Sequence, residues 1–372
     1  MVGGVPTSPD EIETLDEFDQ VIKDRSLRGF RLQGLDLTDP ARTDALLTAD
    51  ATDAVFLGCR LQPKAAAHIR AQGALVFPPV PHLPFDPYRG LLYTPEELFE
   101  GLGTGYGSTP DSLSYSWFQQ TKHDGDIFAS MLRSIHDDHM SDALGELLDG
   151  KRVVGVMGGH ALKRGTEAYA AAVRLGRQLA REGYTVATGG GPGAMEAANL
   201  GAYAAPFDDE MLDDALALVG KVPGFDPSIS DWAHAAFAVR ERWPGGGDSV
   251  GIPTWFYGHE PPNAFAGHIA KYFANATRED GLLARSNAGV VFLPGAAGTV
   301  QEIFDAATPN YYESRGEPVP MILVDREHWT ERLPAWQLLT SLARGRSMEH
   351  RIALVDEVRE VPAALARLSA AG

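Results

Sequence analysis

The sequence predicts an α/β fold in which a parallel sheet carries helices on both faces. Short apolar segments recur along residues 151–325, a helical segment follows most of them, and glycine-rich turns join strand to helix. Strands that are buried on both faces are nearly continuous apolar runs, and strands that alternate with helices usually pair in parallel. The second half of the chain is therefore expected to form a Rossmann-like sheet.

The expected strands cover residues 152–157, 184–188, 249–257, 288–293 and 320–325. Helices are expected at residues 166–182 and 194–204, over most of 262–285 and from residue 299 onward. In these helical stretches apolar residues recur at the three- and four-residue spacing of one helical face. Residues 205–248 break the alternation with acidic helical stretches and a glycine triplet, so we interpret them as an insertion that is either a lid or an oligomer contact.

The first 150 residues have a different character. Residues 27–37, 54–61 and 74–77 have the composition of short strands, and the five prolines of residues 78–87 predict an extended loop or linker. Residues 124–148 carry the apolar stripe of a helix. We expect two parts: an N-terminal accessory region of short strands and helices over residues 1–150, and a Rossmann-like domain over residues 151–372.

Composition excludes several classes of partner. With 32 basic and 50 acidic residues the formal net charge is −18, which disfavours binding to a nucleic-acid backbone or an anionic membrane. Cys59 is the only cysteine, so neither an intramolecular disulfide nor a cysteine-based metal site is expected. The acidic N-terminus does not resemble a signal peptide, and no apolar run has the length of a membrane helix. A cytoplasmic protein is expected.

The sequence gives only weak evidence for a metal site. His136, Asp137, Asp138 and His139 are adjacent, and adjacent residues of a helix point in different directions. We therefore interpret these four residues as a solvated helix face, and we expect neither a metal nor a cofactor.

Three glycine-rich turns follow expected strands, at residues 158–160, 189–193 and 294–298. In an open parallel sheet, ligands bind at the carboxyl ends of the strands. Each turn leads into a helix, whose free N–H groups and dipole favour an anion. Neither GxxxxGK[ST] nor a clean GxGxxG is present, so no P-loop and no standard NAD site is expected. Together the turns predict a site for a small anionic molecule.

The third turn continues into Thr299 and Glu302, within the sequence PGAAGTVQE. Their spacing places a hydroxyl and a carboxylate on one face of a helix, near its N-terminus. Two interpretations remain open. Thr299 and Glu302 form a capping box that only stabilises the helix, or they contact the phosphate and the reacting part of a ligand.

Residues 294–302 resemble the PGGxGTxxE signature of the LOG family of phosphoribohydrolases, with Ala296 in place of the second glycine. Residues 188–202 (TGGGPGAMEAANLGA) resemble the family's other signature, which begins with a GGG turn. The resemblance covers residues 151 to about 330. It implies hydrolysis of the N-glycosidic bond of a nucleoside 5′-monophosphate, AMP-like or a cytokinin nucleotide, to the free base and ribose 5-phosphate. It also implies a homodimer or a larger homo-oligomer.

The resemblance implies that Glu302 and Arg278 are catalytic. A carboxylate beside the ribose can stabilise an oxocarbenium-like transition state and orient water. Arg278 lies within one residue of the family's active-site arginine, whereas Arg285 matches a second, less informative arginine. Glu196 either touches the ribose or caps its helix. The residues expected to bind the substrate and its phosphate are Gly158, Gly159, Gly189, Gly190, Gly191, Met195, Glu196, Gly295, Gly298 and Thr299.

Other features favour a divergent member or a different function. His160 stands where the family has small hydroxyl residues and would add a titrating group near the base, and Arg164 is placed to meet an anion. A GGGPG-x-M-E turn also resembles molybdenum-cofactor carriers and nucleotide-sensing proteins, so a non-catalytic binding protein is the alternative. A lysine decarboxylase is not expected, because no segment resembles a lysine motif for pyridoxal phosphate.

Overall fold

The computed structural model describes residues 11–123, 125–257, 260–314 and 316–370. The chain divides into two compact units, Met1–Leu91 and Leu92–Gly372. The sequence predicted a boundary between the two parts at residue 150. The structure instead groups residues 92–150 with the larger unit. The reason is tertiary packing: a helix of this segment contacts the helix that carries Arg278, and Asp111 forms a buried ion pair with Lys271.

The first unit is built on a parallel sheet whose four strands are paired in sequence order. The strands are β1 (Glu11–Ile12), β2 (Arg31–Gln33), β3 (Val55–Leu57) and β4 (Leu75–Phe77). The helices between them are α1 (Leu15–Val21), α2 (Pro40–Leu46) and α3 (Pro63–Ala71). The last three strands lie within the predicted segments. The helices were not predicted, because seven to nine residues are too few to show an apolar repeat.

The second unit confirms the predicted α/β class. Its seven-stranded sheet is parallel throughout, in the order β11-β10-β9-β5-β6-β7-β8. The strands are β5 (Val153–Met157), β6 (Thr185–Thr188), β7 (Val250–Gly251), β8 (His268–Ile269), β9 (Gly289–Phe292), β10 (Met321–Val324) and β11 (Ile352–Val355). The chain builds outward from β5 to β8 and then returns to place β9 on the other side of β5. The strand order therefore reverses between β5 and β9, where such sheets bind ligands.

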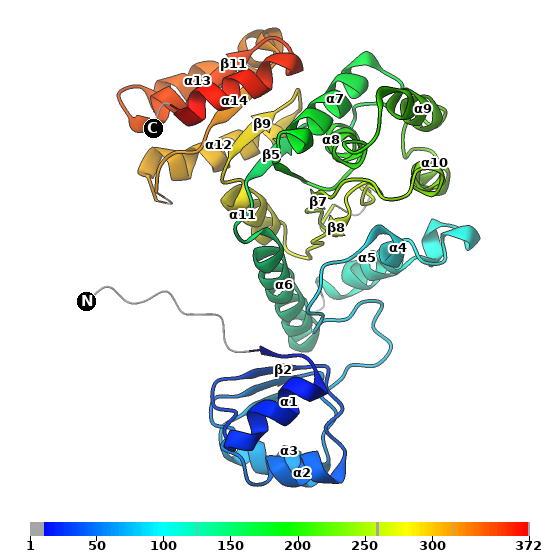
Figure 1. Cartoon of the computed structure of the whole chain (residues 1–372), viewed down its shortest axis with the longest axis vertical. Helices are drawn as coiled ribbons and strands as arrows, with labels where there is room; N and C mark the ends of the chain where they lie inside the picture. Colours follow the sequence, from blue (N-terminus) through cyan, green and yellow to red (C-terminus); the bar gives the residue numbers. More distant parts are fainter. Residues whose placement is uncertain (1–10, 124, 258–259, 315, 371–372) are drawn as a thin grey trace. The chain divides into compact units, whose positions relative to one another are not determined.

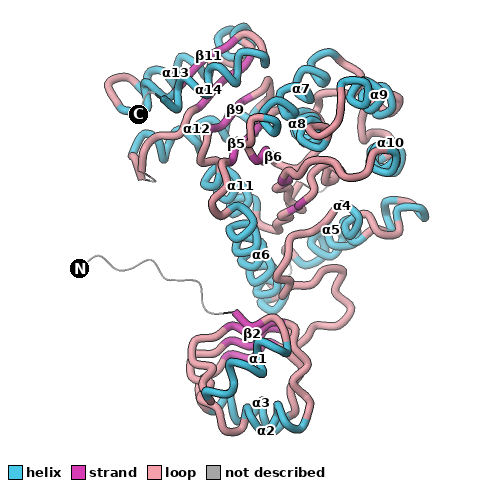
Figure 2. Tube along the Cα trace, viewed as in Figure 1, coloured by secondary structure: helices cyan, strands magenta, loops and turns pink. Residues whose placement is uncertain are grey.

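Helices cover both faces of this sheet (Figures 1 and 2). One layer contains α7, α8 and α14, while α11 contacts β5 and α12 contacts β9. The helices of the unit are α4 (Pro95–Leu98), α5 (Pro110–Thr121), α6 (Ile127–Leu148), α7 (Glu167–Arg181), α8 (Ala194–Tyr203), α9 (Asp209–Val219), α10 (Ile229–Arg242), α11 (Asn275–Arg285), α12 (Ala297–Tyr312), α13 (Ala335–Ala343) and α14 (Val361–Ala370).

Two glycines bring α7 and α8 close together. A Cβ atom on Gly176 would collide with the carbonyl oxygen of Ala198, and one on Gly201 would collide with that of Val173. The helices therefore approach with backbone against backbone, as only glycine permits. This contact fixes α8, whose first turn follows the glycine triplet at residues 189–191.

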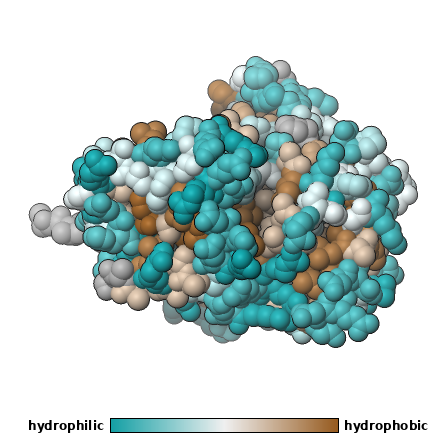
Figure 3. Space-filling model, turned by 90° about the horizontal axis from the view of Figure 1, so that it is seen from above, coloured by the Kyte–Doolittle hydropathy of each residue, from teal (hydrophilic) through white to brown (hydrophobic). Residues whose placement is uncertain are grey.

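The predicted insertion, residues 205–248, contains α9 and α10. These helices contribute Met211, Ala215 and Val239 to the same apolar core as α7 and α8. In the described part of the chain the insertion is thus packed into the domain. Figure 3 views one face of the whole molecule, on which hydrophilic residues cover most of the surface and hydrophobic residues gather in the hollows between them.

The structure corrects the prediction that residues 262–285 are mostly helical. Only α11 is helical there, and the preceding residues form a turn, bends and the short strand β8. Ala270 and Tyr272 donate backbone hydrogen bonds to Gly251 and Pro253, which replaces helical bonding with strand pairing. Long-range pairing, which the local pattern does not reveal, overrides helical propensity here. No helix in the described ranges is long and apolar enough to cross a membrane.

Candidate functional site

The three glycine-rich turns meet at the carboxyl ends of β9, β5 and β6, which are adjacent in the sheet. The N–H of Gly159 donates to the carbonyl of Pro294 at 3.1 Å, and its own carbonyl accepts from the N–H of Ala194 at 3.2 Å. A Cβ on Gly158 would lie 2.7 Å from that of Ala194. The first turn is therefore clamped between the other two, and the predicted convergence of the turns is present.

The second turn is buried beneath side chains. A Cβ on Gly189 would lie 2.7 Å from the sulfur of Met195, and one on Gly191 would lie 2.9 Å from its terminal methyl carbon. Gly190 has a φ of +70° and leaves room for Pro253. These glycines admit Met195 and Pro253, so in this conformation the turn does not open onto solvent.

Asn199 and Asn263 hold the second turn, and the sequence analysis missed both. Asn263 donates to the carbonyl of Gly191 at 3.2 Å and to the side-chain oxygen of Asn199 at 3.0 Å. Thr188 also donates to this oxygen, and its hydroxyl accepts the N–H of Gly190. All three side chains are buried. Asn199, shortly after the glycine triplet in the sequence, was the only available signal; Asn263 is 72 residues from Gly191, and only the fold brings it to the turn.

The third turn lies at the start of α12, and the structure contradicts the capping-box interpretation. The helix begins at Ala297, its N-cap is Ala296, and no side chain caps it. Thr299 is thus inside the first turn, buried against Gly295, where a Cβ would collide with its hydroxyl. Gly298 is exposed and faces open space. Glu302 is therefore free of a capping role.

Arg278 and Glu302 face each other from α11 and α12. The guanidinium Nη1 lies 3.6 Å from the carboxylate Oε1, and the side chains are only 10% and 13% exposed. The Nε of Arg278 is buried and has no hydrogen-bond partner among the described residues. Arg278 Nη1 also lies 3.6 Å from where a Cβ of Gly189 would be. The two predicted catalytic residues and two of the turns are therefore neighbours.

Burial raises the pKa of Glu302 to about 7. The guanidinium of Arg278 opposes this shift, whereas the nearby carboxylates of Glu279 and Asp305 add to it. A carboxyl group that titrates near neutral pH, beside a cation and close to helix N-termini, is typical of acid–base and electrostatic catalysis.

Asp137 positions Arg278 from the neighbouring helix α6. Its carboxylate accepts the N–H groups of Phe273 at 2.9 Å and Ala274 at 2.8 Å, immediately before α11 begins. His136 is also buried and lies 2.8 Å from the hydroxyl of Tyr93. The prediction of a solvated face at residues 136–139 is therefore wrong for the buried His136, Asp137 and His139. Within the described ranges no group of residues could hold a metal ion.

Arg285 has different contacts. It donates to the carbonyls of Ser141 on α6, at 2.6 Å, and Gly281 on its own helix, at 3.4 Å. These bonds join α11 to α6 and do not involve Glu302.

Glu196 and Arg164 form a buried ion pair. Arg164 Nε donates to Glu196 Oε2 at 3.0 Å, its Nη2 pairs with the other carboxylate oxygen, and its Nη1 donates to the carbonyl of Trp232. Both side chains are almost fully buried. The structure thus places the predicted ribose contact and the predicted anion contact against each other, inside the protein.

We expect the substitution Arg164→Ala to lower the free energy of unfolding by about 3–5 kcal/mol, because it leaves the Glu196 carboxylate buried without its partner. Urea unfolding measures this loss. Arg174→Ala is the matched control: Arg174 pairs with Glu167 on the surface, where a lost ion pair changes stability by about 0–1 kcal/mol. Equal losses in the two variants would contradict a buried pair.

His160 is paired at the edge of the same site. Its Nδ1 lies 3.2 Å from Glu260 Oε1, with the side chains 49% and 22% exposed. The other oxygen of Glu260 lies 3.6 Å from where a Cβ of Gly191 would be. His160 therefore pairs with a carboxylate beside the second turn.

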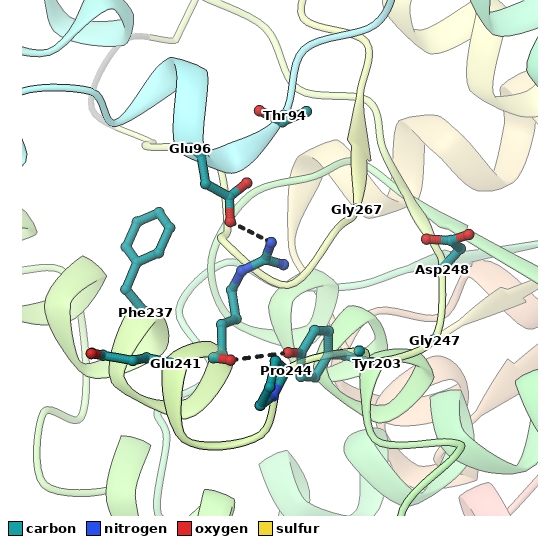
Figure 4. Close-up of a pocket in the computed structure, with 12 residues that line it drawn as sticks. Thr94, Glu96, Tyr203, Phe237, Glu241, Pro244, Gly247, Asp248 and Gly267 are labelled. Carbon is teal, nitrogen blue, oxygen red and sulfur yellow. Dashed lines mark hydrogen bonds and ion pairs between the residues drawn. The ribbon is translucent and has the colours of Figure 1, made fainter.

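A cavity of about 600 Å³ lies near the amino ends of β7 and β8, away from the turns (Figure 4). Glu96, Glu241 and Asp248 line it, and Arg240 already donates to Glu96 at 2.6 Å. Three carboxylates and one neutralised arginine would repel a phosphate, so this cavity does not fit the expected anionic ligand.

Two family models match the chain. Residues 235–365 match one described as possible lysine decarboxylase, and residues 151–206 match the SLOG cluster4 family. The segment between the two matches lies within the predicted insertion. The match over residues 235–365 extends beyond residue 330, where the sequence analysis placed the end of the resemblance. No curated protein matches the chain.

Solved structures with a similar arrangement include a molybdenum cofactor binding protein from the phototrophic bacterium Rippkaea orientalis. It is 17% identical with a TM-score of 0.37, and the match covers 59% of this chain and 97% of that one. A Moco carrier protein from Chlamydomonas reinhardtii is 20% identical with a TM-score of 0.36, over 59% of this chain and 98% of that one.

Proposed function

We propose that the LOG-like domain of this chain, to which residues 151–206 and 235–365 belong, is a phosphoribohydrolase of nucleoside 5′-monophosphates. The products would be the free base and ribose 5-phosphate. The observation that carries the proposal is the pairing of Arg278 with Glu302 where the glycine turns meet. The catalytic domain that we propose spans residues 151–372.

The start of α12 is the proposed phosphate site. The first backbone hydrogen bond of this helix runs from the N–H of Val300 to the carbonyl of Ala296. The N–H groups of the residues before Val300 therefore come ahead of the repeating hydrogen bonds of the helix. Gly298 is exposed there, and the helix dipole favours an anion. Because the glycines at 189–191 are covered, we assign them, with Met195, to the wall of the site. Glu302 lies four residues beyond Gly298, roughly 6 Å along the helix, which is the scale of a ribose.

In the proposed reaction the ionised Glu302 faces the anomeric carbon. As the bond from this carbon to the base breaks, positive charge develops on the ribose and the carboxylate stabilises it. A water oxygen then bonds to the same carbon, and its proton passes to Glu302 or to the departing base. Arg278 orients Glu302 and offers a donor to the base. Glu196, paired with Arg164, supports the start of α8 without touching the substrate.

The test is incubation of the pure protein with a panel of nucleoside 5′-monophosphates, cytokinin nucleotides and the corresponding nucleosides. We expect chromatography to show base released from a monophosphate but not from its nucleoside. Binding of a nucleotide or of molybdenum cofactor without release from any of them would instead support the binding-protein alternative.

We also infer a homo-oligomer, a dimer or larger, and a cytoplasmic location. Light scattering of the purified chain measures the first, and a monomer at micromolar concentration would contradict it.

A further inference from the structure

Glu279 connects the two helices that carry the candidate catalytic residues. It follows Arg278 on α11 and is 9% exposed. Its Oε1 accepts from Asn275 at 2.8 Å and its Oε2 from Gln301 at 2.7 Å. Gln301 immediately precedes Glu302 on α12. Glu279 therefore ties α11 to α12 directly beside the pair formed by Arg278 and Glu302.

The charge of Glu279 also bears on Glu302. In the described part of the chain no cation lies within ion-pair distance of Glu279, and the guanidinium of Arg278 pairs with Glu302. The carboxylate of Glu279, bonded to Gln301, therefore lies close enough to Glu302 to act on its charge. Like charges in such proximity disfavour ionisation of one of the two groups.

Few other charged groups face Glu302. Asp305 acts on it from its own helix, and Arg278 and Glu279 act from α11. Helix α12 also packs on β9 and α13, whose residues, GVVF and AWQLLTSLA, contain no titratable side chain. The short helix Ser347–Arg351 meets the far end of α12, where Ser347 bonds Glu313. Among charged neighbours, the pKa of Glu302 therefore depends on one arginine, which lowers it, and two carboxylates, which raise it.

We propose that Glu279 is a positioning residue for Glu302: it holds the Glu302 carboxylate opposite Arg278 and places a second negative charge near it. The effect on turnover rests on the proposed function. The effect on the titration of Glu302 does not.

The activity test is the pH profile of kcat/KM. If Glu302 acts as a carboxylate with a pKa of about 7, activity should rise tenfold per pH unit below that value. Removing a negative neighbour favours the ionised form of Glu302. Glu279→Gln should therefore move the rising, acidic limb of the pH profile to lower pH by about one unit. Relative to pH 8, activity at pH 6 should then increase about fivefold.

Two variants separate charge from position. Asp280→Asn removes the same formal charge from the adjacent, exposed position of α11, and its limb should stay within a few tenths of a unit of the wild type. Gln301→Ala breaks the bridge to Glu279 and keeps both charges, so kcat should fall while the pH limb stays in place. An equal shift in Asp280→Asn and Glu279→Gln would overturn a specific role for Glu279.

The direct test needs no turnover. In protein labelled with ¹³C at the glutamate side-chain carboxyls, NMR follows each carboxyl through pH, and the signal missing from Glu302→Gln identifies Glu302. We expect its midpoint to fall by about one unit in Glu279→Gln. An unchanged midpoint overturns the proposal. A shifted midpoint in a protein that cleaves no nucleotide overturns the proposed function alone.

Folding of Glu279→Gln is checked by circular dichroism. If it does not fold, Glu279→Asp serves instead, because it retains the charge but draws it back from Gln301 by one methylene. Its kcat should fall, with a smaller shift of the Glu302 midpoint in the same direction. An unchanged kcat together with an unchanged midpoint would overturn the proposal.

Discussion

Glu302→Gln is expected to lower kcat by about 10²–10⁴-fold, with little change in stability or nucleotide binding. Glutamine has nearly the same shape but carries no charge, so it cannot stabilise the developing cation on the ribose or accept a proton from water. Base release by chromatography measures turnover, and titration calorimetry measures binding. Because neutral glutamine also removes a buried carboxyl with a raised pKa, the fold should not suffer.

The matched control is Glu313→Gln, at the other end of the same helix, where Glu313 is exposed and bonded to Ser347. It removes the same charge from the C-cap of α12 and should leave kcat within about twofold of the wild type. Wild-type turnover in Glu302→Gln would rule out the proposed mechanism, whatever the behaviour of the control.

Arg278→Ala is expected to lower kcat/KM by about 10²–10³-fold. The guanidinium orients Glu302 and offers a donor inside a site that is largely buried. Its loss also removes the group that holds down the pKa of Glu302, which should rise further. The loss of activity relative to the wild type should therefore be largest at acidic and neutral pH and smaller at alkaline pH, where Glu302 ionises even in the variant, and a pH profile of kcat/KM checks this.

Arg285→Ala is the companion variant, because Arg285 lies on the same helix but bonds backbone carbonyls. Per folded molecule it should retain most of the activity, although unfolding should require less urea. If Arg285→Ala were the more damaging to kcat/KM, the assignment of the catalytic arginine on α11 would be wrong.

Features that depend on residues close together along the chain were predictable from the sequence. The alternation of apolar strands with helices follows from local periodicity, and the parallel sheet of the second unit confirms it. The glycine turns were equally visible, since strand order places their ends together once the sheet is parallel. Arg278 and Glu302 were selected by resemblance, and the structure brings them within 3.6 Å.

Tertiary contacts decided the rest, because they join residues that no local pattern connects. Glu196 lies in a glycine-rich signature, yet Arg164, 32 residues away, pairs with it in the interior. Thr299 and Glu302 have capping-box spacing, yet the helix begins before them at Ala297. Glu279 bonds Gln301 across 22 residues. Periodicity and turn chemistry thus determine the sheet and its turns, whereas the ionisation and partners of each buried charge depend on which distant groups the fold brings against it.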